Sequence, residues 1–179
     1  MTTDLMKNKK GLIMGVANDH SIAWGIAQTL YNNGANLAFT YQGDNFKKRI
    51  EPLAKKINSD KYLINCDVLK QDELENAFKI IKDDWGNIDF IVHSIAHSDK
   101  NELNGKYINT SRENFLDTLE ISCFSLTNIV RVFEPIINDN GSILTLTYGG
   151  SEKVIPNYNV MGVAKAALES SVRYLASDL

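Results

Sequence analysis

The sequence predicts an α/β fold in which a parallel sheet is covered by helices on both faces. Short apolar runs alternate with longer amphipathic stretches along the 179 residues, which is the order expected of βαβ units. The apolar runs are continuous, which is typical of strands buried on both faces. Right-handed crossovers then favour a Rossmann-type doubly wound sheet, formed by a single domain over residues 1–179.

Each element has its own sequence pattern. The apolar runs predict five strands, at residues 10–16, 35–41, 61–68, 88–96 and 141–148. Amphipathic patterns predict helices at residues 21–34, 44–57, 70–86 and 112–137, and a last helix that carries Tyr158 and Lys165. Gly34 and Gly86 suit helix ends, Ser111 suits a helix start, and Pro52 is expected to perturb the second helix.

Composition excludes several classes of function. The net charge is −3 with both signs interspersed, so nucleic acid and anionic membranes are not expected as partners. The apolar runs are too short to span a bilayer, and the N-terminus has no signal-peptide pattern. Cys66 and Cys123 form no CxxC motif and predict free thiols in the cytoplasm. No spacing of His, Cys and Asp indicates a metal site.

The segment after the first strand, GVANDHSIAWG at residues 15–25, is a possible phosphate-binding loop. It lacks the usual fingerprints, because Ala17 and His20 occupy the later positions of GxGxxG, and Asp19 and Ser21 those of GxxxGxG. Gly15 alone also fits a simple tight turn. A pyrophosphate needs free N–H groups at a helix N-terminus. Ser21 lies where it can cap the next helix, donate to a phosphate, or do both.

Tyr158 and Lys165 lie seven residues apart near the end of the chain. In a helix this spacing turns the chain by about 700°, close to two full turns, so both polar tips point to one side. Spacing alone is more often that of a surface pair than of a site.

Motifs at the ends of successive elements carry a family resemblance. GVANDHSIAWGIAQ, LAFTYQ, CDV, VHSIA and LTLTYGGSEKVIPNYNVMGVAKAALESSVRYLA follow one another in this order. With them the chain resembles the bacterial enoyl-acyl-carrier-protein reductases, a divergent branch of the short-chain dehydrogenases/reductases. The stretch from Tyr148 to Lys165 is the most specific, since this branch has Y-x6-K with a second tyrosine ten residues upstream, whereas ordinary members have Y-x3-K.

The resemblance implies NADH-dependent reduction of the trans-2 double bond of an acyl chain on acyl carrier protein. It implies that Tyr158 stabilises the enolate at the thioester carbonyl, that Lys165 holds the nicotinamide ribose, and that Tyr148 lines the acyl pocket. Tyr148, Tyr158 and Lys165 are then catalytic, and Ala96 joins the two tyrosines in binding substrate. The other implied cofactor residues are Gly15, Ser21 and Ile22 at the pyrophosphate, Gln42, Asp67 and Val68 at the adenosine, and Ser94, Ile95 and Ala96 at the nicotinamide.

The end of the second strand bears on cofactor choice. Gln42 stands where NAD enzymes usually have an acidic residue, and the nearest cations, Lys47 and Lys48, fall inside the next helix, which favours NADH. Asp67 also fits a plain turn residue. His93 and His97 are interpreted as hydrogen-bonded structural histidines.

Two further expectations concern the whole protein. Members of the resembled family continue beyond the position of Leu179, so the C-terminal strands and the substrate loop are expected to be missing here. A reductase of ketones, or a non-catalytic nucleotide-binding module if the chain ends at Leu179, remain alternatives. Apolar residues on more than one side of the last two helices predict a homotetramer.

Overall fold

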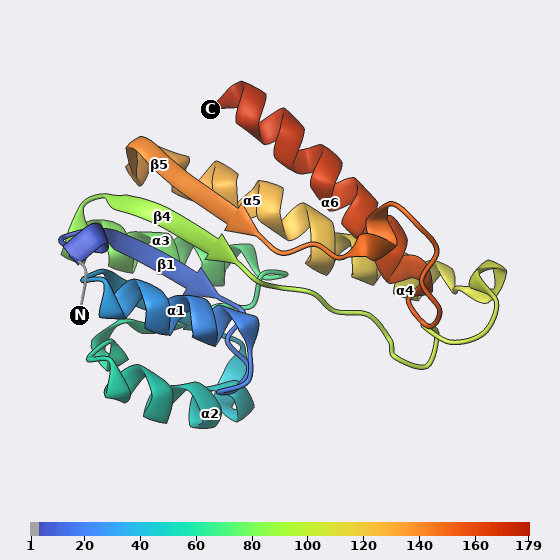
Figure 1. The fold of residues 1–179 in the computed structure, drawn as a ribbon, viewed down its shortest axis with the longest axis horizontal. Coiled ribbons are helices and arrows are strands. Elements are labelled where there is room, and N and C mark those ends of the chain that lie inside the picture. Colours follow the sequence, from blue (N-terminus) through green and yellow to red (C-terminus); the bar gives the residue numbers. More distant parts are fainter. Residues whose placement is uncertain (1–3) are drawn as a thin grey trace. The chain divides into compact units, whose positions relative to one another are not determined.

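The computed structural model describes residues 4–179, which form two compact units (Figure 1). The first unit comprises the chain up to Ser94 together with Val132–Thr145. The second comprises Ile95–Arg131 and Leu146–Leu179. The single domain expected over residues 1–179 stays a prediction.

The first unit contains a parallel sheet of five strands. In chain order these are β1 (Lys10–Met14), β2 (Asn36–Tyr41), β3 (Leu63–Asn65), β4 (Ile88–His93) and β5 (Ile137–Thr145). Their order in the sheet is β3-β2-β1-β4-β5, and every pairing is parallel. This arrangement confirms the predicted Rossmann-type fold, and it puts the point where the strand order reverses between β1 and β4.

Helices cover both faces of this sheet (Figure 1). The helices α1 (Ile22–Asn32) and α2 (Gly43–Lys56) lie on one face, and α3 (Gln71–Trp85) lies on the other. Trp24 of α1 and Ile50 of α2 share a buried cluster with Phe39 of β2. On α3, Phe78 meets Phe133 edge to face, with ring centroids 5.8 Å apart. Strands with buried residues on both faces explain the continuous apolar runs in the sequence.

Three features of the first unit differ most from the sequence-based prediction. β3 is shorter than residues 61–68, since a 3₁₀ turn (Asp60–Tyr62) precedes it. α2 runs through Pro52 without a break in the helix. β5 begins at Ile137 rather than at residue 141, because the register shifts where Ile137 pairs with Ile88 and Ser142 pairs with Phe90. The four residues of β5 between these two pairs, NDNG, have the composition of a turn, which hid the start of the strand.

The second unit is built from helices and short turns. It contains α4 (Arg112–Leu119), a π-helical segment (Glu120–Phe124), the 3₁₀ turns Tyr107–Asn109 and Gly149–Ser151, and α6 (Asn159–Asp178). α5 (Ser125–Phe133) begins in this unit and ends in the first. The single helix predicted over residues 112–137 is therefore interrupted by the π-helical segment and ends in a 3₁₀ turn (Glu134–Ile136). Among the described residues, no helix is both long enough and apolar enough to cross a membrane.

Candidate functional site

The carboxyl ends of β1 and β4 meet at Gly15 and Ser94, two of the predicted cofactor residues. Gly15 has a φ of +93°, a conformation that side chains other than glycine rarely adopt. A Cβ atom on Gly15 would lie 2.5 Å from the carbonyl carbon of Ser94 and would overlap its oxygen. The Ser94 amide also donates to the carbonyl of Met14 at 3.0 Å. The backbones of the two strand ends therefore touch, and only glycine allows this contact.

Ser21 organises the loop that leads from Gly15 into α1. It is the N-cap residue by position, as predicted, but its hydroxyl makes no cap bond to the helix. Instead, Ser21 Oγ accepts hydrogen bonds from the amides of Ala17 and Asn18, both at 3.0 Å. The first N–H groups of a helix have no partner within it, and such groups are the donors that a phosphate needs. Next to them, Ile22 is 69% exposed.

Gln42 and Asp67, predicted for the adenosine end, are joined directly. Gln42 Nε2 donates to Asp67 Oδ2 at 2.9 Å, which links the residue after β2 to the segment after β3. The other oxygen of Asp67 accepts from the amide of Leu69 at 3.0 Å, so Asp67 is also the turn residue that its sequence context suggested. Val68, inside this turn, is half-buried.

Tyr158 lies at the N-cap of α6, immediately before the first helical residue. The prediction that the last helix itself carries Tyr158, on one side with Lys165, is therefore wrong by one position. Asn157 and Asn159 on either side have positive φ angles, 59° and 30°, so the backbone is irregular where α6 begins. The ring of Tyr158 meets that of Tyr148 edge to face, with centroids 5.1 Å apart. Two of the three predicted catalytic residues are thus in contact.

Lys165 is buried in α6 with 6% of its surface exposed. Its ammonium donates to the carbonyl of Leu146 at 2.8 Å, which uses one of its three donors. Burial lowers the pKa of Lys165. Burial raises the pKa of Tyr158, and the neighbouring Tyr148 raises it further. The Tyr158 phenol therefore keeps its proton at neutral pH and can donate a hydrogen bond to a developing oxyanion.

The predicted residues separate into two groups along the chain. The first unit holds Gly15, Ser21, Ile22, Gln42, Asp67, Val68 and Ser94, and the second holds Ile95, Ala96, Tyr148, Tyr158 and Lys165. Ile95 is half-buried, and Ala96 is exposed. His93 is fully buried and lies 3.0 Å from Thr145 Oγ1 through its Nδ1 atom, in agreement with a structural role.

Sequence reasoning missed a buried polar cluster that holds the segment after Ala96. Asn114 Oδ1 accepts from the amide of Asp99 at 2.9 Å, and the Thr118 hydroxyl donates to Ser98 Oγ at 2.9 Å. Ser122 Oγ accepts from the amide of His97 and donates to its carbonyl, both at 2.9 Å. Polar residues at positions 114, 118 and 122, four apart in an otherwise apolar helical pattern, are the pattern that would have indicated this cluster.

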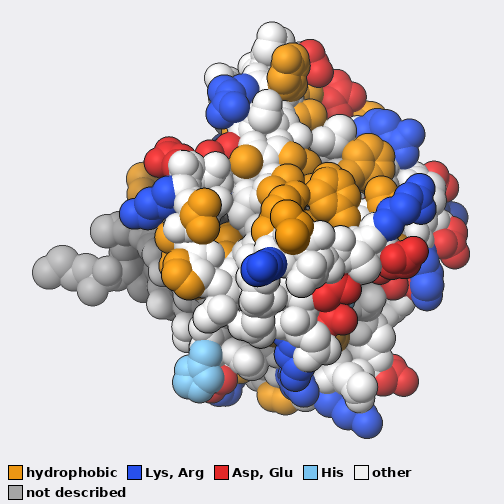
Figure 2. Space-filling model, turned by 90° about the vertical axis from the view of Figure 1, so that its right-hand side faces the viewer, with side chains coloured by type: hydrophobic (Ala, Val, Ile, Leu, Met, Phe, Trp, Pro, Cys, Tyr) orange, Lys and Arg blue, Asp and Glu red, His pale blue; other side chains and the backbone are white. Residues whose placement is uncertain are grey.

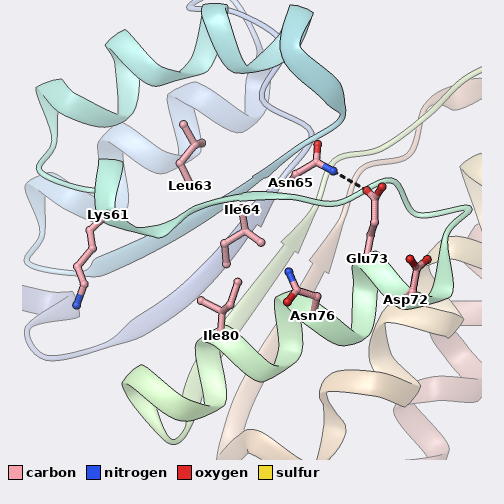
Figure 3. Close-up of a pocket in the computed structure, with 8 residues that line it drawn as sticks. All are labelled: Lys61, Leu63, Ile64, Asn65, Asp72, Glu73, Asn76 and Ile80. Carbon is pink, nitrogen blue, oxygen red and sulfur yellow. Dashed lines mark hydrogen bonds between the residues drawn. The ribbon is translucent and has the colours of Figure 1, made fainter.

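A separate pocket lies in the first unit between β3 and α3 (Figure 3). Its lining residues are Lys61, Leu63, Ile64, Asn65, Asp72, Glu73, Asn76 and Ile80. Asn65 and Glu73 are joined across it by a hydrogen bond of 2.7 Å (Figure 3). None of the predicted site residues lines this pocket, so it is not the candidate site.

The sequence matches a known protein family along most of its length. The family model described as "Enoyl-(Acyl carrier protein) reductase" matches residues 15–179. The chain is 58% identical to the enoyl-[acyl-carrier-protein] reductase [NADH] 2 of Rhizobium meliloti, over 97% of the chain and 65% of that relative. It therefore spans about two thirds of this relative's length.

Solved structures give the same result. The enoyl-(acyl-carrier-protein) reductase of Anaplasma phagocytophilum, in complex with NAD, superposes with a TM-score of 0.96 at 53% identity, over 99% of this chain and 68% of that one. The Bacillus cereus enoyl-acyl carrier protein reductase, with NADP+ and indole naphthyridinone, has a TM-score of 0.94 at 46% identity, over 98% and 68%. On this sequence and structural similarity, the chain belongs to the enoyl-(acyl-carrier-protein) reductase family.

Proposed function

We propose that the whole protein reduces the trans-2 double bond of enoyl chains on acyl carrier protein with NADH, as a step of type II fatty acid biosynthesis. The observation that carries this proposal is the half-buried Tyr158 phenol, packed against Tyr148 and followed in the same segment by the buried ammonium of Lys165. Membership of the family over residues 15–179 supports the choice of reaction.

Tyr158 supplies the hydrogen bond that this reaction needs. When a hydride adds to C3 of an enoyl thioester, negative charge moves to the carbonyl oxygen, and a proton at C2 then completes the reduction. A donor held ready for that oxygen contributes about 3 kcal/mol of transition-state stabilisation. The raised pKa of Tyr158 keeps the phenol in the donor form at neutral pH. Tyr148, which is 53% exposed, lines the acyl pocket beside it.

The residues present fit a dinucleotide cofactor. NADH, when bound, supplies the hydride. Gly15 is in contact with Ser94, and Ser21 takes up the amides of Ala17 and Asn18. The first N–H groups of α1, at the end of this turn, are then the donors that suit a pyrophosphate. Lys165 has two further N–H donors for the ribose hydroxyls. The remaining contacts are proposed for Ile22 at the pyrophosphate, Gln42, Asp67 and Val68 at the adenosine, and Ser94, Ile95 and Ala96 at the nicotinamide.

The hydrogen bond between Gln42 and Asp67 supports NADH over NADPH. It holds a carboxylate at the adenosine end, where a 2′-phosphate would add two negative charges. Because the Bacillus cereus relative was solved with NADP+, the preference needs a direct measurement. Titration of the whole protein with each cofactor should give a lower dissociation constant for NADH, and equal constants would reject this assignment.

The reaction itself is tested by following NADH absorbance with two thioesters side by side. Crotonyl thioester should be consumed with NADH oxidation. Turnover of acetoacetyl thioester alone would indicate a reductase of ketones. Absence of turnover with both, despite cofactor binding, would indicate a nucleotide-binding module.

Assembly as a homotetramer in the cytoplasm completes the proposal. Apolar side chains remain exposed on the helical elements of the second unit: Leu116, Phe124, Val163 and Val172. Hydrophobic side chains also gather in one area of the face in Figure 2, with charged side chains around them. Such patches are typical of subunit interfaces. Sedimentation equilibrium of the whole protein should give four subunits, and a monomer at micromolar concentration would contradict this. The free thiols of Cys66 and Cys123 suit a reducing compartment.

A further inference from the structure

The ring of Tyr158 rests directly on the backbone of Gly150. A Cβ atom on Gly150 would lie 2.7 Å from Tyr158 Cε1 and closer still to Cδ1. Carbon atoms in contact are normally about 3.5–4.0 Å apart. Any side chain at position 150 would therefore displace the ring. The φ angle of Gly150 is not among the positive ones, so it is space rather than backbone conformation that requires glycine here.

A second glycine, Gly162, lets α6 approach the backbone of Gly150, which is the seat on which the ring of Tyr158 rests. A Cβ atom on Gly162 would lie 2.7 Å from the carbonyl oxygen of Gly150, but at an ordinary 3.6 Å from Tyr158 Cδ1. Glycine inside a helix is unfavourable relative to alanine. Its presence near the start of α6 is explained by the close approach of the Gly150 carbonyl.

Other contacts fix the remaining sides of Tyr158. The ring of Tyr148 meets it edge to face, with an angle of 67° between the ring planes. The side-chain amide of Asn159, the next residue, donates to the carbonyl of Glu102 at 3.1 Å and lies 3.4 Å from those of Asn104 and Gly105. The backbone beside Tyr158 is thus tied down by Asn159, and its ring is in contact with Gly150 and Tyr148.

We infer that Gly150 and Gly162 are positioning residues that set the location of the Tyr158 phenol for catalysis. The inference rests on the proposed function, in which that phenol donates to the thioester oxygen. A hydrogen bond of this kind is strongly sensitive to position, and a displacement of about 1 Å can lower the rate about a hundredfold. A methyl group at position 150 forces a shift of that order on the ring.

Gly149 provides a matched control in the same 3₁₀ turn. Its nearest neighbour for an added Cβ is Lys153 Cε at 3.9 Å, an ordinary contact with a flexible side chain. Gly149→Ala changes the same kind of residue one position away and leaves Tyr158 in place.

The experiment compares Gly149→Ala, Gly150→Ala, Tyr158→Phe and the double variant Gly150→Ala/Tyr158→Phe in the whole protein. Steady-state kinetics with crotonyl thioester would give kcat and KM, and NADH titration would give the cofactor dissociation constant. Gly150→Ala should lower kcat at least tenfold with the NADH constant within about twofold, while Gly149→Ala stays near wild type. In the Tyr158→Phe background, Gly150→Ala should cost little more, since the hydroxyl it displaces is already absent.

The outcomes separate this inference from the proposed function. A wild-type protein without enoyl turnover would reject the proposed function. An active wild type with equal kcat for Gly149→Ala and Gly150→Ala, or an equal loss from Gly150→Ala in both backgrounds, would reject the positioning role alone. If Gly150→Ala does not fold, Gly162→Ala takes its place, because its methyl group meets the Gly150 carbonyl and not the ring of Tyr158. It should lower kcat by less than the tenfold expected for Gly150→Ala. This loss should also vanish in the Tyr158→Phe background. Failure of both variants to fold would mean that the glycines serve the fold and not the phenol.

Discussion

Replacement of Gly15 by alanine tests the contact between the ends of β1 and β4. The new methyl group would meet the Ser94 carbonyl group, with its Cβ atom 2.5 Å from the carbonyl carbon. Both partners are backbone, so neither can rotate away, and the strand ends must separate. Since the residue also has a φ of +93°, alanine would be strained in any case.

The expected loss has two parts. A non-glycine residue in the left-handed region costs about 1–2 kcal/mol. Separation of the strand ends also breaks the bond from the Ser94 amide to the Met14 carbonyl, which is worth about 0.5–1.5 kcal/mol. We therefore expect Gly15→Ala to lower the free energy of unfolding by about 1.5–3.5 kcal/mol and to weaken NADH binding.

Gly86→Ala is the control. Gly86 also has a positive φ, 76°, but a Cβ atom added there would have no neighbour within 4 Å, and the residue ends α3 ahead of β4. It should show the backbone strain alone, with unchanged NADH binding. The assays are urea unfolding followed by circular dichroism, and cofactor titration by NADH fluorescence. Equal effects of the two substitutions on stability and on NADH affinity would refute the steric argument.

Two further predictions concern charged groups. Lys165→Ala should raise the dissociation constant of NADH more than that of the acyl substrate, because each charge-assisted bond to a ribose hydroxyl is worth about 1.5–3 kcal/mol. The control is Lys153→Ala, which changes an exposed lysine. If calorimetry gives the same NADH dissociation constant for both variants, the proposed role of Lys165 is wrong. Burial would raise the pKa of Asp89, but hydrogen bonds from the Lys10 amide, Lys9 and Asn138 outweigh it and lower that pKa. The stability Asp89 adds is therefore present above its unfolded pKa and lost as pH falls through its folded pKa. Asp89→Asn should destabilise the protein by about 1–3 kcal/mol at pH 7 and flatten the acid side of its stability profile, whereas an unchanged profile would contradict this.

The alternation of apolar runs was enough to predict the sheet, because β1, β2 and β4 are buried on both faces. The family motifs were enough to predict that Gln42 lies near Asp67 and that Tyr148 lies near Tyr158. The seat of Tyr158 was not predictable, since nothing in the local sequence shows that Gly150 and Gly162 approach the same ring. Such contacts depend on the path of the chain between distant positions.

The helix over residues 112–137 shows a different limit. In a regular helix, Phe115, Leu116 and Leu119 would fall on the same stripe as Leu126, Ile129, Val130 and Phe133. The structure instead buries Asn114 and Thr118 of α4 and leaves Leu116 exposed. The π-helical segment explains the difference, because one extra residue in a turn rotates α4 by about 100° relative to α5. Some of the apolar residues that predicted a tetramer therefore fall on more than one side of the predicted helix only because its buried side changes at the π-helical segment. This rotation is a change of phase within one helix.

That change of phase means that the length of the segment Glu120–Phe124 matters more than its composition. Removal of a single residue would let the helix continue regularly from α4 into α5, with no bond lost inside the helix itself. The same deletion would swing Asn114 and Thr118 by about a quarter turn away from Ser98 and Asp99 and bring apolar side chains to the place they leave. A variant with a regular helix would thus lose the hydrogen bonds from Asn114 and Thr118 that hold the segment after Ala96. The π-helical segment therefore acts as a spacer that sets which side of α4 faces that segment.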